Sequence, residues 1–210
     1  SRVKAAPSGA ALTLETGATG TAGGDIRLLS EKNTFDDVTV RAADAAKGID
    51  GTIQLKTTAP NTGKTSGTDG LTVTFGEGAD GSAPLTVATT DDITIENIEA
   101  HSDLNVDGKL QTTSGSATFT TGGNLNILET ADLASADEMT FVATGDTTVD
   151  GTVTAAHDLN IGANGTSTLN GTATANNVNI TSGDDANVNG TVTAKSVTVD
   201  AGGDANVAGT

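Results

Sequence analysis

Histidine is the most common general acid or base in enzymes, so His101 and His157 are the first candidates for chemistry in this chain. Each is followed closely by an Asp-Leu-Asn string, and the two lie 56 positions apart. In the coiled chain predicted below, this spacing is about three turns, or roughly 14 Å along the axis. A proton-transfer pair needs contact at hydrogen-bond distance, so we expect two exposed corner histidines and no catalytic dyad.

The sequence also lacks the patterns of other catalytic sites. The chain has no cysteine and no Gly-x-Ser-x-Gly nucleophile elbow, and Thr113 to Ser116 reads as a loop. Phosphate-loop and dinucleotide fingerprints are missing too. Enzymes that act on polysaccharides combine clustered carboxylates with aromatic platforms, whereas this chain has no Trp and no Tyr. The sequence therefore predicts a protein that is not an enzyme.

Calcium is the cofactor that an acidic solenoid would bind, through paired carboxylates and backbone carbonyls. The nonapeptide calcium-repeat signature is not found, because Gly202-Gly203-Asp204 and Gly183-Asp184-Asp185 lack its spacing. Glu77 and Asp80 form the single candidate loop. We expect no cofactor, and a calcium site at Glu77 and Asp80 stays open as the alternative.

Threonine pairs recur at regular spacing and predict a hydroxyl-rich outer face. They are Thr152/Thr154, Thr172/Thr174 and Thr191/Thr193. Threonine is favoured on any exposed strand, which is the interpretation we prefer. An ice-binding face and a glycan-bearing face are the alternatives, the latter permitted by Asn-x-Thr sequons at Asn164, Asn170, Asn179 and Asn189.

Composition limits the fold and the partners. The net charge is −17, which excludes nucleic acid and anionic membranes as partners because both require clustered Lys and Arg. No apolar run approaches the ~18 residues of a membrane span, so we expect no membrane insertion by this segment. There are 27 Gly and only 4 Phe, so the core must be thin and aliphatic.

A repeat of about 19 residues organises the C-terminal third. Gly-Thr recurs at residues 151, 171, 190 and 209, in steps of 20, 19 and 19. Apolar residues alternate with polar ones around each Gly, which is typical of a strand with one buried face. A second alternating strand follows in each unit, as at Leu159/Ile161, and corners are rich in Gly, Asn and Asp. The first unit is one residue longer, and the extra residue falls at the corner that contains His157.

These features predict an all-β fold, a right-handed parallel β-helix of about eleven turns with two strands in each turn. We expect residues 1–210 to form a single solenoid, with irregular coils in 1–144 and regular repeats in 145–210. Loop excursions are expected between Thr57 and Gly70 and from Gly76 to Ala83. Both chain ends look like cuts, so we expect a segment of a longer chain. Earlier apolar-polar-apolar triplets continue the pattern: Ile26/Leu28, Val38/Val40, Ile53/Leu55, Val73/Phe75, Ile93/Ile95, Leu104/Val106 and Leu125/Ile127.

The strings Gly190-Thr191-Val192-Thr193-Ala194 and Ala201 to Val207 resemble the repeats of filamentous-haemagglutinin-like bacterial adhesins. This resemblance implies a right-handed parallel β-helix, a secreted or cell-surface location, and an adhesive or scaffolding role. The expected function is therefore a structural or adhesive shaft segment of a large exported bacterial surface protein. A self-assembling subunit of a surface layer, sheath or filament is the alternative. The expected partners are the chain itself, other surface components, or glycans of host or neighbouring cells.

Overall fold

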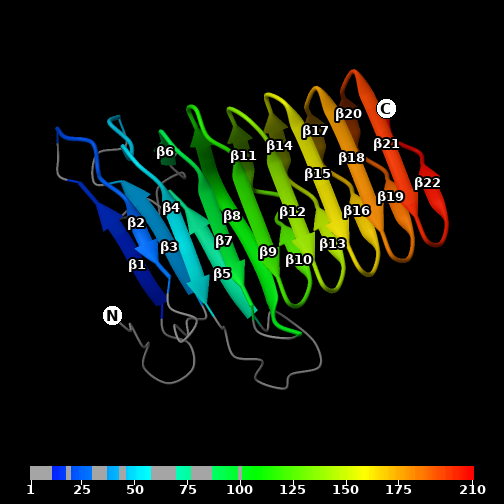
Figure 1. Cartoon of the computed structure of the whole chain (residues 1–210), viewed down its shortest axis with the longest axis horizontal. Coiled ribbons are helices and arrows are strands. Elements are labelled where there is room, and N and C mark those ends of the chain that lie inside the picture. Colours follow the sequence, from blue (N-terminus) through cyan, green and yellow to red (C-terminus); the bar gives the residue numbers. More distant parts are fainter. Residues whose placement is uncertain are drawn as a thin grey trace.

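The computed structural model describes residues 11–17, 20–29, 37–42, 46–57, 70–76, 87–98 and 101–210. Within these ranges the regular secondary structure is all β-strand, and the strands pair in parallel between successive coils. The coils stack along one axis into a β-solenoid (Figure 1). The predicted fold class is thereby confirmed.

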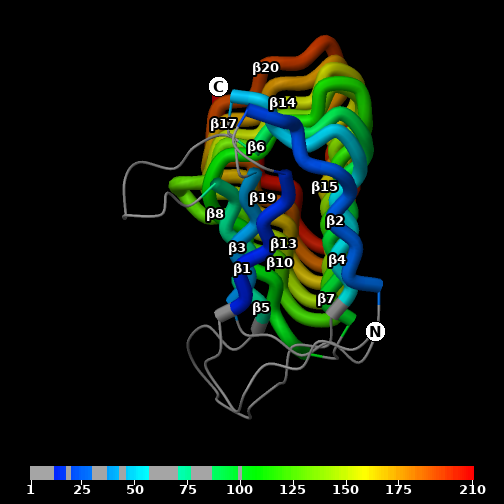
Figure 2. Tube along the Cα trace, turned by 90° about the vertical axis from the view of Figure 1, so that its left-hand side faces the viewer, coloured from blue at the N-terminus to red at the C-terminus, as the bar shows by residue number. Residues whose placement is uncertain are grey.

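One side of the solenoid is an eight-stranded sheet that faces the viewer in Figure 1 and lies on the right in Figure 2. Its strands, in stacking order, are β2 (Ile26–Leu28), β4 (Ile53–Thr57), β7 (Ile93–Asn97), β9 (Ala117–Thr121), β12 (Met139–Ala143), β15 (Asp158–Ala163), β18 (Asn177–Ser182) and β21 (Ser196–Ala201).

A 14-stranded sheet forms the other two sides, because it bends along β8 (Asp103–Thr112). Leu104 to Val106 of β8 pair with β10, and Lys109 to Gln111 pair with β11. The long wing contains β1 (Ala11–Thr16), β3 (Asp37–Ala42), β5 (Gly70–Phe75), β10 (Leu125–Ile127), β13 (Thr147–Val149), β16 (Ser167–Leu169), β19 (Ala186–Val188) and β22 (Ala205–Val207). The short wing contains β6 (Val87–Thr89), β11 (Asp132–Ser135), β14 (Thr152–Ala155), β17 (Thr172–Thr174) and β20 (Thr191–Thr193).

Each regular turn has three strands, so the predicted two-strand turn is wrong (Figure 2). The prediction and the structure differ at the Gly-Thr positions. The single strand predicted there consists of two strands separated by a corner. The β13 strand ends at Val149 and β14 begins at Thr152, with Gly151 buried between them. Stacking requires glycine here, since a Cβ at Gly171 would overlap the Gly151 carbonyl oxygen of the preceding coil.

The solenoid has fewer turns than the predicted eleven. Eight stacked strands span seven intervals, which gives about seven full turns. The aligned first inward residues are at positions 26, 53, 93, 117, 139, 159, 178 and 197, and the steps between them are 27, 40, 24, 22, 20, 19 and 19. Early coils are longer than the repeat of the C-terminal third, and the same chain length therefore completes fewer turns.

Gly51 and Gly108 lie in similar strings of the sequence but do not represent equivalent points of stacked repeats. Gly51 accepts a backbone hydrogen bond from Asp91 one coil later and lies just before β4. Gly108 instead lies within β8, opposite Phe75 of β5. The two glycines therefore occupy different corners of the coil.

The core is a continuous column of side chains enclosed by the three walls. The apolar triplets of residues 26–127 form the N-terminal part of this core. All their members are buried except Leu28, which is half-buried. Phe119 and Phe141 lie on neighbouring coils, and their tilted rings contact each other with centroids 5.7 Å apart. The inward orientation predicted for these triplets is thus confirmed.

The extra residue near His157 leaves both flanking strands in register, as predicted. Thr154 aligns with Thr174 before the corner, and Asp158 aligns with Asn177 after it. Val192 also points inward, but β20 is the last strand of its wing and the Val192 side chain is only half-buried. Most of both predicted excursions, 58–69 and 77–83, lies outside the described residues.

Candidate functional site

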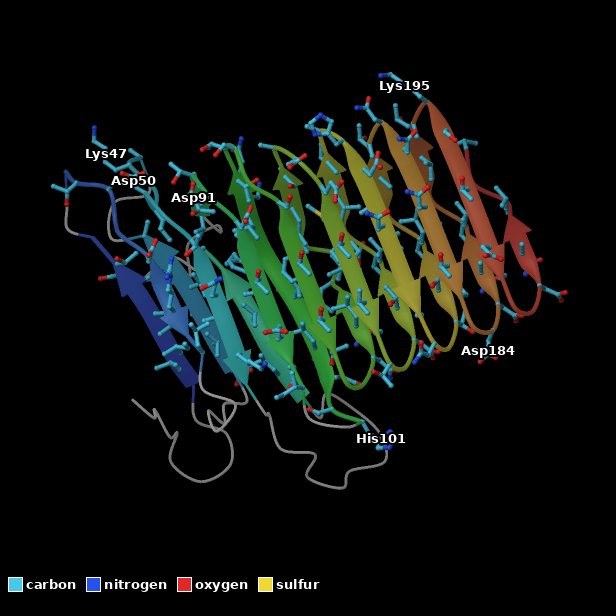
Figure 3. All side chains as sticks on the ribbon, viewed as in Figure 1. Lys47, Asp50, Asp91, His101, Asp184 and Lys195 are labelled. Carbon is cyan, nitrogen blue, oxygen red and sulfur yellow. The ribbon has the colours of Figure 1, made fainter. Side chains whose placement is uncertain are left out.

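The two histidines lie at different corners of the coil. His157 precedes β15 of the eight-stranded sheet, whereas His101 precedes β8 of the long wing. Figure 3 shows His101 at the lower edge, opposite Lys195 at the upper edge, and Lys195 stacks on Asn176 and His157 through backbone hydrogen bonds. Both histidines are exposed and they form no dyad, as predicted. Their similar Asp-Leu-Asn strings nevertheless enter different sheets.

His157 pairs with an acidic side chain of the preceding coil. Its Nδ1 lies 2.7 Å from Oδ1 of Asp137, and both side chains are about half exposed. An exposed contact of this kind contributes at most about 1 kcal/mol to stability. The pair fixes one corner of the coil, and no further titratable group joins it among the contacts of the described residues.

His101 borders a cavity of about 170 Å³ at the corner between the eight-stranded sheet and the long wing. Its backbone is left-handed, with φ of 61°, and its N–H donates to the Gly122 carbonyl at 3.0 Å. The cavity is small and half open, with a mixed lining: His101, Asp103, Gly122, Gly123, Asn124, Thr144 and Gly145.

Buried Asn97 holds the chain that leads into this cavity. Its side-chain amide donates to the Asp103 carbonyl at 2.8 Å and to the Ser102 hydroxyl at 3.1 Å. Thr121 of the next coil donates to the Ser102 carbonyl at 2.8 Å. The amide of Asn97 and the hydroxyl of Thr121 thus supply hydrogen-bond donors to the Asp103 and Ser102 carbonyls, as buried polar groups require.

A ladder of side-chain oxygens runs along the same corner, which we call the Asx corner. It consists of Asp103, Asn124, Asp146, Thr166, Asp185 and Asp204, one residue in each of six coils. The Oδ1 atoms of Asp103, Asn124 and Asp146 each accept the backbone N–H of the next residue in the ladder at 2.8 Å. Asp185 does the same for Asp204, also at 2.8 Å.

Neighbouring glycines make room for this ladder. A Cβ at Gly145 would overlap Oδ1 of Asn124, and one at Gly165 would overlap Oδ1 of Asp146. The recurring Gly-Asp and Gly-Asn dipeptides are the signal of this ladder in the sequence. The side chains of Asp103, Asn124, Asp146 and Asp185 stabilise the stacking of coils, because each provides an acceptor to a backbone donor that lies at a corner.

No metal centre is found in the part of the chain that the structure describes. That part contains no group of three or more His, Cys, Asp or Glu side chains positioned to hold a metal ion. The candidate residues Glu77 and Asp80 lie outside the described residues. A calcium site at Glu77 and Asp80 therefore stays a prediction.

Removing one carboxylate of the Asx corner should separate its hydrogen-bonding role from its charge. We expect Asp146→Ala to lower the free energy of unfolding by about 1–2 kcal/mol, because the Thr166 N–H loses its acceptor. Asp146→Asn keeps an oxygen at the same place and should change stability by less than about 0.5 kcal/mol. Urea denaturation followed by circular dichroism measures both. Equal losses in the two variants would show that the charge, rather than the hydrogen bond, is the stabilising element.

The threonine pairs do form stacked ranks on the short wing. Thr152, Thr172 and Thr191 align in one column, and Thr154, Thr174 and Thr193 align in a second column. They point outward, since the residues between them point toward the core. In the preceding coil the aligned residues are Asp132 and Ala134, so the array begins at Thr152 and Thr154.

Three of the four sequon asparagines belong to ladders between coils. The amides of Asn170 and Asn179 donate to Asp150 and Asn160, and that of Asn189 donates to Asn170, at 2.8 to 2.9 Å. Such ladders add polar contacts between coils on the outside of the stack. They give these asparagines a structural role that is independent of glycosylation.

Within the described residues, no helix has the length and apolar character needed to cross a membrane. The sequence matches no protein-family model and no curated protein, and the structure matches no solved structure.

Proposed function

We propose that the chain is a shaft segment of a large exported bacterial cell-surface protein, in which it serves as a stiff spacer. The observation that carries this proposal is the unbroken stack of eight strands, whose coil length becomes constant from β15 to β21. At ~4.8 Å per coil, the stack is about 35 Å long. Every coil contacts its neighbours through backbone hydrogen bonds and buried side chains, which makes such a rod resistant to bending.

The resemblance to filamentous-haemagglutinin-like adhesins supports the same role. The strings that carry it, 190–194 and 201–207, fall on β20, the end of β21 and β22 of the regular coils. The outward side chains of these coils are mostly polar, chiefly Thr, Asn, Asp and Ser, which keeps a long exposed rod soluble. An acidic surface also limits adhesion to anionic cell components.

The proposal is tested by electron microscopy of the intact surface protein, with and without calcium. A shaft predicts isolated thin rods whose appearance does not change with a chelator. Rod length should also increase by about 5 Å for each duplicated coil, at constant width. Ordered sheets or filaments that dissolve on chelation would overturn the shaft and favour the self-assembling surface-layer or filament subunit.

A further inference from the structure

Three asparagines of the regular coils are each followed by Gly and Thr: Asn164, Asn170 and Asn189. An asparagine before glycine is prone to lose its amide group, because glycine has no side chain to shield its backbone nitrogen. That nitrogen attacks Cγ of the asparagine and forms a C–N bond, while ammonia leaves Cγ with the proton of the glycine N–H. Water then opens the cyclic succinimide at either carbonyl, which gives aspartate or isoaspartate.

The three sites share the local sequence Asn-Gly-Thr, so any difference in their reactivity must come from the fold. All three asparagines are exposed, and in each case the glycine N–H donates to a carbonyl of the preceding coil. These hydrogen bonds, 2.9 to 3.0 Å long, join Gly165 to Gly145, Gly171 to Val149 and Gly190 to Leu169. Neither property distinguishes one site from another.

The side-chain amides differ in how firmly neighbouring coils hold them. The amide of Asn170 donates to Oδ1 of Asp150 at 2.8 Å, and Oδ1 of Asn170 accepts the amide of Asn189 at 2.9 Å. Asn189 is therefore held through one atom and Asn170 through two. The side chain of Asn164 makes no hydrogen bond to any described residue. Because Cγ must rotate toward the glycine nitrogen, the side chain without hydrogen bonds reaches the reactive geometry most often.

Gly165 also has a more yielding neighbour than the other two glycines. Cβ atoms at Gly171 and Gly190 would overlap backbone carbonyl oxygens of the preceding coil. At Gly165 the overlapping atom is Oδ1 of Asp146, which is the end of a side chain. A side chain can rotate away, whereas a backbone carbonyl of a stacked coil moves only with its strand. Gly165 can therefore leave its hydrogen bond more readily.

We propose that Asn164 is a site of spontaneous deamidation in the folded chain, and that the ladder of Asp150, Asn170 and Asn189 protects its two asparagines from the same reaction. Each ladder hydrogen bond that must open slows the reaction about fivefold. Asn189 should therefore react about fivefold more slowly than Asn164, and Asn170 about 25-fold more slowly. Asn164 is thus the position at which the rod gains a negative charge with time.

The reaction changes a corner that can accept it. Asp184, labelled at the lower edge in Figure 3, lies at this corner, and its N–H donates to the Gly165 carbonyl at 3.1 Å. Aspartate adds a carboxylate there, and isoaspartate also lengthens the backbone by a methylene group. The corner near His157 holds an extra residue while its flanking strands stay in register. We therefore expect the deamidated chain to remain folded.

The test follows amide loss at the three sites in the folded chain, kept at mildly alkaline pH and physiological temperature. Trypsin leaves residues 110–195 as one peptide, so a second protease and fragment mass spectra separate the sites. The same chain unfolded in guanidinium chloride is the reference, in which we expect the three sites to react at similar rates. In the folded chain Asn164 should react first, but more slowly than in the reference, because the Gly165 N–H must leave the Gly145 carbonyl.

Asp150→Ala tests the protective role of the ladder. It removes the acceptor of the Asn170 amide and should raise the rate at Asn170 about fivefold, with no change at Asn164. Asp158→Ala is the matched control, because Asp158 accepts the amide of Asn177, which no glycine follows. It should leave the rates at Asn164 and Asn170 unchanged. Circular dichroism verifies that both variants are folded.

Three results would overturn the proposal: equal rates at the three sites of the folded chain, a faster reaction at Asn170 or Asn189 than at Asn164, or an intact Asn164 after the unfolded reference has reacted fully. An unchanged rate at Asn170 in folded Asp150→Ala would overturn the protective role of the ladder. The shaft proposal does not depend on any of these outcomes.

Discussion

Replacing Val153 with aspartate is expected to destabilise the solenoid by at least about 4 kcal/mol. The Val153 side chain is fully buried in the core, between Leu133 and Ala173 of the adjacent coils. The buried residues of the described core include no Lys or Arg, so the carboxylate must either remain charged without a partner or take up a proton at a cost. Urea denaturation monitored by circular dichroism should show a much lower midpoint, or two transitions if the stack separates at this coil.

Thr154→Asp is the matched control at the neighbouring position of the same strand. Thr154 points outward and is half-buried, so a carboxylate there stays hydrated. We expect a change within about 1 kcal/mol. Similar losses in both variants would contradict the inward and outward assignment of β14. Val153 is a better test position than Val192, because the strand of Val192, β20, is the last strand of the short wing and its side chain is only half-buried.

Gly171→Ala should be the second most damaging change, with a loss of about 3 kcal/mol. The added methyl group would overlap the Gly151 carbonyl oxygen, which also accepts the Thr172 N–H at 3.0 Å. Relief of this overlap requires two coils to separate at the corner, and the hydrogen bond weakens as they do. Thermal unfolding of the variant and of the unchanged chain, measured at low protein concentration, gives this loss in the free energy of unfolding.

Gly162→Ala tests the steric explanation against a general effect of glycine replacement. Both variants remove the same backbone freedom from the unfolded chain, but only Gly171 has a neighbour that blocks a methyl group. We therefore expect Gly162→Ala to be neutral or to stabilise by about 0.5–1 kcal/mol. A large loss at residue 162 would show that strand position, rather than the close approach of coils, makes glycine necessary.

Period-two alternation predicted the core well, because in a parallel stack the same parity is buried in every coil. It did not predict the third strand. Val149, Gly151, Val153 and Ala155 are all buried, so the alternation passes through the corner without interruption. Because every second residue stays buried through this bend, the hydrophobic periodicity of the sequence does not show where the strand ends. The number of turns was overestimated for a related reason, since residues added between strands do not change the pattern within them.

Similar short strings do not mark equivalent positions in this fold. The Asp-Leu-Asn strings near His101 and His157 suggested similar settings, yet Leu104 packs in the long wing and Leu159 in the eight-stranded sheet. Strands of the eight-stranded sheet, the long wing and the short wing all show the same apolar-polar alternation. A short string of residues therefore does not indicate to which of the three its strand belongs.

The corner is the same at Gly171, Gly190 and Gly209, and this affects how the number of repeats can change in evolution. Each regular coil contacts only the coil before it and the coil after it, so an additional copy meets surfaces like those it replaces. An in-frame duplication of one repeat adds a coil without disturbing its neighbours, and a deletion removes one as cleanly. Unequal recombination between such repeats would alter the length of the rod in a single generation, while the shape and chemistry of its sides stay the same.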